Sequence, residues 1–271
     1  METTRILVSV YLFCLGLCFG SFALATAWRL RKKRNFVSER SECEHCKHVL
    51  ASKDLIPLFS WLSLRGRCRY CGKKISPLLP LAELTGAIVF TLSYISWPYA
   101  LHSGLRIAAF ALWYVALVLL LILFFYDLQW YKLPNKVVHP LWGVAAVYFV
   151  LQFAQDPSIG VLVNGFLAVL VAGGLFWLLY EISDGKWIGF GDVRLGFAIG
   201  LFVARPFMAG LVLFVASITG IIFALPSLVS GSRKLTSKVP FGPLLIIGLV
   251  VVMLYGQQTL DWYMNTILLL P

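Results

Sequence analysis

The stretch IAAFALWYVALVLLLILFFY, residues 107 to 126, carries no charge and is followed directly by Asp127. An α-helix needs about 20 such residues to cross the hydrocarbon core of a bilayer. Two further charge-free runs, residues 6–28 and 158–180, are slightly longer. None of the three alternates polar and apolar residues, as the strands of a membrane barrel do. The sequence therefore predicts an all-α, polytopic membrane protein.

The composition of the whole chain agrees with this prediction. Of its 271 residues, 60% are hydrophobic and 13% are charged, and the mean hydropathy is +0.85. Soluble domains carry about twice that charged fraction. We predict a bundle of about eight transmembrane helices, at residues 6–28, 81–98, 105–126, 137–154, 158–181, 190–204, 207–230 and 241–258.

The distribution of Lys and Arg predicts the orientation of the bundle. Residues 29–80 contain 13 of the 23 basic residues and four acids, which gives +9 of the net charge of +11. Because basic loops stay in the cytoplasm, we place this loop there, together with loops 127–136, 182–189 and 231–240. Both termini then lie outside. We attribute the pI of about 9.5 to this topology and to attraction to anionic membrane lipids, and we expect no nucleic-acid partner.

The chain is expected to have three parts: a first transmembrane helix (1–28), a cytoplasmic loop domain (29–80) and a transmembrane domain of seven helices (81–271). The loop contains two C-x2-C pairs, Cys43 with Cys46 and Cys68 with Cys71. This spacing predicts a zinc-ribbon-like insertion in which four thiolates hold one structural Zn²⁺. Redox dithiols or disulfides are the alternative, which a cytoplasmic position disfavours. His45 and His48 are possible substitute ligands.

Two aspartates border the predicted spans on this same side. Asp127 ends the third span, and Asp192 opens the sixth within GFGDVRLG, residues 189–196. Ionisable residues at such positions are functional candidates, and two close carboxylates share a proton, as in aspartic proteases. The alternatives are structural: Asp127 could pair with Lys132, and Asp192 could pair with Arg194 or cap its helix.

Several other residues are weaker candidates. Gly189 and Gly191 leave room for a neighbouring backbone or an extended substrate peptide beside Asp192. Glu83, early in the second span, could contact a neighbouring helix or belong to a second site. Asp184 precedes a glycine and reads as part of a turn.

Six ordered motifs give the chain a resemblance to the type IV prepilin peptidases, which are GxGD-type membrane aspartic proteases. They are FGSF (19–22) with Trp28-Arg29-Leu30, the cysteine-containing loop IPLFSWLSLRGRCRYCGKKIS (56–76), PLAELTG (80–86), Asp127 with Leu133-Pro134-Asn135, GFGDVRL (189–195) and VPFGPLL (239–245). Arg194 stands where the family usually has Lys.

The resemblance implies an endopeptidase that cuts the short basic leader of prepilins or pseudopilins after a glycine, on the cytoplasmic face of a bacterial inner membrane. It implies Asp127 and Asp192 as the catalytic pair, with Gly189, Gly191, Arg194, Pro240 and Gly242 as substrate-binding or supporting residues. It further implies N-methylation of the new terminus with S-adenosylmethionine, near Glu83 and Gly86.

Two other classes of function remain as alternatives. A short, glycine-interrupted span with a charge inside it also suits a transporter or channel. A membrane scaffold carrying a zinc ribbon would need neither aspartate.

Overall fold

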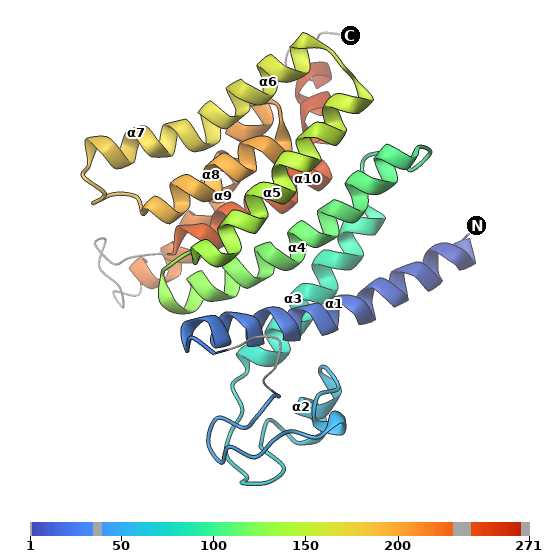
Figure 1. Ribbon diagram of the computed structural model, residues 1–271, viewed down its shortest axis with the longest axis vertical. Helices are drawn as coiled ribbons and strands as arrows, with labels where there is room; N and C mark the ends of the chain where they lie inside the picture. The colour runs from blue at the N-terminus through green and yellow to red at the C-terminus, as the bar shows by residue number, and fades with distance from the viewer. Residues whose placement is uncertain (1, 35–39, 230–239, 267–271) are drawn as a thin grey trace. The chain divides into compact units, whose positions relative to one another are not determined.

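The computed structural model describes residues 2–34, 40–229 and 240–266 (Figure 1). Apart from Pro240, the predicted loop 231–240 lies outside these residues. The chain forms two compact units, Met1–Ile95 and Ser96–Pro271. The division into parts 1–28, 29–80 and 81–271 was made by expected role, and it stays a prediction.

The described residues contain no extended strand, only two isolated bridges in the cysteine loop, which confirms the predicted all-α class. The elements are α1 (Glu2–Arg31), η1 (Ser52–Asp54), α2 (Phe59–Ser63), α3 (Leu78–Ile95), α4 (Gly104–Trp130), α5 (Asn135–Gln155), α6 (Ile159–Val169), η2 (Leu170–Gly174), α7 (Leu175–Ile182), α8 (Phe190–Val203), α9 (Pro206–Val229) and α10 (Phe241–Thr266).

Seven helical segments of the described chain are long and apolar enough to cross a membrane. They are α1, α3, α4, α5, the continuous segment Ile159–Ile182, α9 and α10. The remaining predicted span, the sixth at residues 190–204, is α8, whose 14 residues reach only about 21 Å. Eight of these residues are buried, so α8 is a short helix largely enclosed by its neighbours in the second unit. The protein is a multi-pass membrane protein.

In the first unit, α1 packs closely against α3. The contact is between small residues: a Cβ on Gly16 would lie 2.5 Å from the carbonyl oxygen of Gly86, and Gly20 meets the backbone of Ala82. Because lipid gives helices no hydrophobic reason to associate, such close backbone contact is a common basis of helix pairing in membranes. The cysteine loop connects the two helices.

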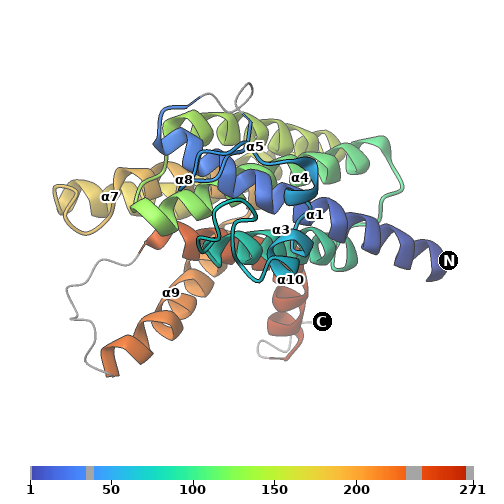
Figure 2. The same cartoon turned by 90° about the horizontal axis from the view of Figure 1, so that it is seen from below.

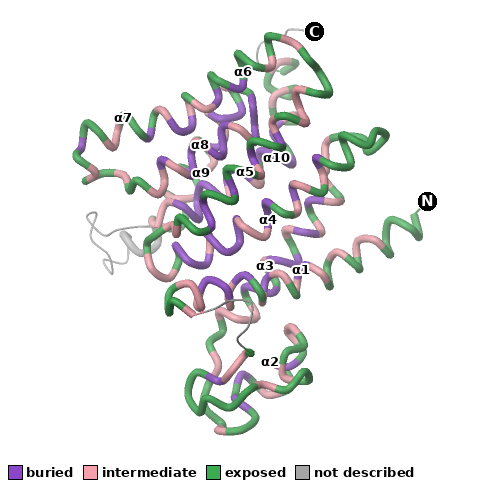
Figure 3. The backbone as a smooth tube through the Cα atoms, viewed as in Figure 1, coloured by how far each residue is buried: buried purple, intermediate pink, exposed green. Residues whose placement is uncertain are grey.

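In the second unit, α5 follows α4 after a tight turn, and α10 packs beside α9 (Figure 2). The buried positions gather on α4, α5, α8 and α10 (Figure 3). Trp113 of α4 meets Phe202 of α8 with ring centroids 6.0 Å apart. The backbones of α8 and the π-helical segment η2 are in close contact. A Cβ on Gly196 would lie only 2.5 Å from the Ala172 carbonyl oxygen. This contact fixes the position of α8, which carries Asp192.

Candidate active site

Asp127 lies in the last turn of α4, where its side chain is buried at 5% exposure. Helix α4 ends at Trp130, and its C-cap residue Tyr131 has a left-handed backbone and donates its N–H to the Asp127 carbonyl at 2.8 Å. A carboxylate near a helix C-terminus is unfavourable, because that end carries partial negative charge. Within the described part of the chain Asp127 forms no ion pair, so the expected alternative of a pair with Lys132 is wrong.

Asp192 lies in the first turn of α8, half-buried, and close enough to Asp127 for their charges to interact. The N-cap residue of α8 is Gly189, and the Asp192 carboxylate, three residues later, accepts a hydrogen bond from the Gly189 backbone N–H, as the third residue of a capped helix commonly does. The predicted pairing with Arg194 is also absent among the described ion pairs. The pairing with Arg194 is therefore wrong, whereas the carboxylate of Asp192 does help to cap α8 through the Gly189 amide.

Arg194 instead connects α8 to α5. Its Nη1 donates to Oδ1 of Asn135, and its guanidinium lies 4.5 Å from the centroid of the Phe190 ring. The Trp142 indole N–H donates to the Arg194 carbonyl at 2.9 Å. Arg194 thus joins the Leu133-Pro134-Asn135 motif to the GxGD motif, which were separate in the sequence analysis.

The start of α10 completes this end of the second unit. The Gly242 backbone amide donates a hydrogen bond to the Asp127 carboxylate. A Cβ on Gly242 would lie 2.7 Å from Asp127 Oδ2, so only glycine fits there without displacing the carboxylate. Pro240 directly precedes α10 and is half-buried.

Leu133 is the residue that sequence reasoning missed. Its side chain would be 3.1 Å from a Cβ on Gly191 and 3.4 Å from one on Gly242, so it packs against the first turns of both α8 and α10. Gly191 is accounted for by this close contact. A Cβ on Gly189 would meet Asp192 Oδ2 at an ordinary 3.4 Å, so sterics alone do not require glycine at that position. The motif around Leu133 was visible in the sequence, but its role depends on how three helices meet.

The arrangement can support acid–base chemistry. Two carboxylates lie together where two helices, α8 and α10, present their N-termini, which carry partial positive charge and stabilise anions. Two neighbouring carboxyl groups that share one proton supply a base and an acid in the same site.

The four loop cysteines form the second candidate site. Their sulfurs all lie within 4.8 Å of one another, and Cys43 Sγ is 3.9 Å from Cys71 Sγ. Sulfurs that bind Zn²⁺ tetrahedrally at about 2.3 Å are about 3.8 Å apart. The residues therefore fit a metal ion. None of the four is in a disulfide, which contradicts the disulfide alternative.

The two cysteine turns repeat one backbone pattern. Cys43 N–H donates to the His48 carbonyl and Lys47 N–H to the Cys43 carbonyl, both at 3.0 Å. In the second turn, Cys68 N–H donates to Lys73 at 2.8 Å and Gly72 N–H to Cys68 at 2.9 Å. The His48 ring of the first turn packs against the Tyr70 ring of the second turn, and their centroids are 3.7 Å apart. Each turn aims two sulfurs at one centre.

The thiols of this cluster differ in acidity. Burial works against ionisation of Cys43, but the backbone amides of Cys46 and His45 outweigh it and lower the pKa to about 7. The Lys73 amide favours the thiolate of Cys71, but burial and the other thiols raise its pKa to about 11. Four crowded sulfurs cannot all ionise by themselves, and a divalent cation at their centre removes that conflict.

Glu83 and Gly86 lie on α3 in the first unit. Glu83 is 3% exposed; its carboxylate accepts the Leu58 N–H at 2.7 Å and a hydrogen bond from the Ser21 side chain. Gly86 contacts the backbone of α1. Glu83 thus makes the contact to a neighbouring helix that was one of its two expected roles.

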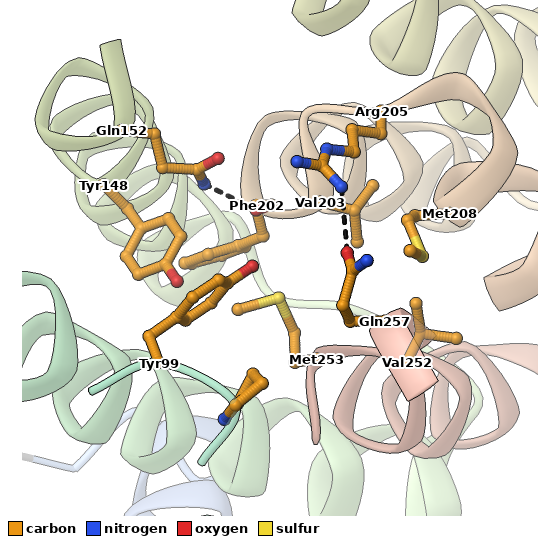
Figure 4. Close-up of a pocket in the computed structure, with 11 residues that line it drawn as sticks. Tyr99, Tyr148, Gln152, Phe202, Val203, Arg205, Met208, Val252, Met253 and Gln257 are labelled. Atoms are coloured by element: carbon orange, nitrogen blue, oxygen red, sulfur yellow. Dashed lines mark hydrogen bonds between the residues drawn. The ribbon is translucent and has the colours of Figure 1, made fainter. Parts of the chain in front are cut away.

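A separate hollow lies at the other end of α8, around Phe202, Val203 and Arg205 (Figure 4). Arg205 donates to Gln257 Oε1 and Gln152 donates to the Phe202 carbonyl, both at 2.9 Å. The aspartates border the first turn of α8, so neither belongs to this hollow.

Comparison with known proteins identifies two family regions. Residues 14–97 match the bacterial peptidase A24 N-terminal domain, and residues 114–225 match the type IV leader peptidase family. No solved structure matches the chain.

Curated relatives match over most of the chain. A prepilin leader peptidase/N-methyltransferase of Aeromonas salmonicida (strain A449) is 30% identical over 88% of this chain and 78% of its own length. The type 4 prepilin-like proteins leader peptide-processing enzyme of Escherichia coli O78:H11 is 33% identical over 86% of this chain and 88% of its own length. A prepilin leader peptidase/N-methyltransferase of Bacillus subtilis (strain 168) is 27% identical over 94% of this chain and 97% of its own length. This chain belongs to the type IV leader peptidase family.

Proposed function

We propose that the protein is a membrane aspartic endopeptidase that removes the short basic leader of type IV prepilins or pseudopilins by cleavage after a glycine. The observation that carries the proposal is that Asp127 and Asp192, from different helices, lie close enough for their charges to interact, beside the N-termini of α8 and α10. Family membership and the printed activities of the relatives support the same reaction.

The chemistry follows from a carboxylate pair that shares one proton. The ionised member removes a proton from a water molecule, whose oxygen attacks the carbonyl carbon of the scissile peptide bond. The protonated member donates to the carbonyl oxygen as negative charge develops there. Collapse of the tetrahedral intermediate breaks the C–N bond as a proton passes to the leaving nitrogen. The amide of Gly242 holds the Asp127 carboxylate in place, and Arg194 positions the first turn of α8 through Asn135.

For the cysteine loop we propose a structural zinc site, with Cys43, Cys46, Cys68 and Cys71 as its ligands. The metal would supply the energy that fixes a loop with few buried residues, because a metal that binds only the folded loop stabilises it.

N-methylation of the new terminus with S-adenosylmethionine is also proposed, from the names of the relatives. The predicted residues Glu83 and Gly86 do not fit a cofactor contact in this structure, because Leu58, Ser21 and the backbone of α1 already occupy them. We therefore derive no methyl-transfer step from these two residues.

We place the protein in the bacterial inner membrane with the aspartates and the cysteine loop in the cytoplasm and both termini outside. The support is the excess of Lys and Arg in the loops on that side. Prepilin leaders are themselves basic, so the same rule would keep them on the side of the aspartates.

The test is to incubate the purified protein, in liposomes, with a full-length prepilin and labelled S-adenosylmethionine, and to identify the products by mass spectrometry. We expect a free leader that ends in glycine, with label on the mature N-terminus. Failure of the wild-type protein to cut any prepilin, together with proton flux that depends on Asp192, would favour the transporter alternative instead. Cleavage without label would limit the function to proteolysis.

A further inference from the structure

Four large apolar side chains are exposed on the cysteine loop, around the short helix α2. Leu55, Ile56, Phe59 and Leu62 are 47, 50, 70 and 63% exposed. They form one sequence-local surface, which we call the apolar loop patch. Soluble surfaces tolerate scattered apolar residues, but a concentration of them usually marks a contact with a partner or a membrane.

A hydrogen bond to α3 sets the depth of this patch relative to the membrane. The N–H of Leu58, which lies between patch residues, donates to the buried Glu83 at 2.7 Å. Helix α3 has 18 residues, about 27 Å, so all of it is needed to span a core of about 30 Å. Glu83 is five residues into this helix, about 7 to 8 Å beyond its start. Leu58 therefore reaches the level of the bilayer interface.

The loop holds the patch in a defined shape. The Ser60 hydroxyl donates to the carbonyls of Lys53 and Ile56, at 3.0 and 2.7 Å. Leu58 adopts a φ of +57°, which is strained for leucine and is maintained by the bond to Glu83. On the other side, the Asp54 carboxylate accepts from Arg69 at 2.7 Å and from the Tyr70 hydroxyl at 2.9 Å. The exposed side chains are thus preformed for contact.

The charges around the patch identify its partner. Between residues 40 and 77 the sequence has eight basic residues and three acids. Five of the basic residues are exposed and carry no described ion pair: Lys53, Arg65, Arg67, Lys73 and Lys74. An apolar surface at interface depth, with a surplus of cations around it, matches the acyl chains and anionic headgroups of one leaflet.

We propose that the apolar loop patch inserts into the membrane interface and that its basic surroundings bind anionic lipid headgroups. The insertion holds the cysteine loop against the bilayer surface. The proposal is independent of the peptidase function.

Photo-crosslinking on the full-length protein tests this proposal. Phe59→p-benzoylphenylalanine and Leu62→p-benzoylphenylalanine are reconstituted separately into vesicles of equal parts phosphatidylglycerol and phosphatidylcholine, and are irradiated. Ser52→p-benzoylphenylalanine, at an exposed polar position of the same loop, is the matched control. Mass spectrometry then counts protein–lipid adducts.

We expect lipid adducts at both patch positions and none at position 52. Phosphatidylglycerol should be enriched over phosphatidylcholine in the adducts by about fivefold for each headgroup contact with a basic residue. Crosslinks to protein at Phe59 and Leu62, or no crosslink at all, would overturn insertion. Adducts in the bulk lipid ratio would overturn the anionic-headgroup contact.

Discussion

The cysteine site and the aspartate site are assembled in different ways. All four cysteines lie between residues 43 and 71, and two similar turns bring them together by local backbone hydrogen bonds. The aspartates come from α4 and α8, and Gly242 of α10 contacts the Asp127 carboxylate, so that three helices must pack correctly to form the pair.

This difference determines what each site depends on. A site made by local turns needs its metal ion, because the sulfurs have little else to hold them together. A site made by helix packing needs close backbone contact, and a single added methyl group can displace its groups. Perturbations of the two sites should therefore be separable.

The largest effect is expected from removing either carboxylic acid. Asp127→Asn and Asp192→Asn should each lower the rate of prepilin cleavage by about 100- to 10,000-fold, because an amide cannot act as the general base or acid. Cleavage rate is measured by gel shift on purified enzyme. The control is Asp184→Asn, an exposed aspartate outside the site. Wild-type cleavage by either site variant would break the proposed assignment.

A packing change at α10 should have the next largest effect. In Gly242→Ala, the new Cβ would lie 2.7 Å from Asp127 Oδ2 and must displace the carboxylate. A displacement of about 1 Å can cost about 100-fold in rate, so we expect a loss of 10- to 100-fold. Gly210→Ala, which meets nothing within 4 Å, should leave the rate unchanged. Equal rates for the two variants would show that the contact at Gly242 does not matter.

Removing a cysteine should disrupt the metal site and leave the aspartate site intact. Cys43→Ser should lose the bound metal and the protection of loop amides from hydrogen exchange, because three ligands hold zinc less well than four. The helices α4, α8 and α10 should keep their protection. Cys18→Ser, an exposed cysteine of α1, is the control for thiol loss. Loss of protection in α4 as well would show that the sites are not separable.

The smallest effects compare the two cysteine turns with each other. Lys47 and Gly72 occupy equivalent places, with φ of +59° and +68°. Gly72→Ala should destabilise the loop by about 1 kcal/mol, since alanine is strained there, whereas Lys47→Gly should be neutral or stabilising by less than about 1 kcal/mol. The measurement is the chelator concentration that removes half of the metal. A Gly72→Ala variant as stable as the wild type, or a Lys47→Gly variant that loses metal more easily, would contradict the equivalence of the turns.

Much of the fold could be predicted from the sequence, because charge-free runs and basic loops are local signals. The spans, the all-α class and the cysteine cluster needed no knowledge of packing. The π-helical segment at Leu170–Gly174 could not be predicted, because it arises where α8 approaches the backbone of a neighbouring helix. The short length of α8 was visible only as a glycine-rich, weakly bounded span.

The sequence predicted which residues form the candidate site, but it did not predict the contacts that hold them. Asp127 and Asp192 stood out because an ionisable residue in or bordering a membrane span is a candidate for function. The connection from Arg194 to Asn135, and the contacts of Leu133 with the starts of α8 and α10, depend on tertiary structure. For the same reason, Glu83 had two open roles until its bond to Leu58 was seen.

The central claim is that Asp127 and Asp192 act as one pair, and a double variant tests it most directly. Residual cleavage of prepilin is measured over long incubations for Asp127→Asn, Asp192→Asn and the combined variant, after thermal melting has shown that all three are folded. Groups that act as a unit give strongly non-additive losses. The account predicts that the double variant is no slower than the slower single variant. Losses that multiply would contradict a shared site.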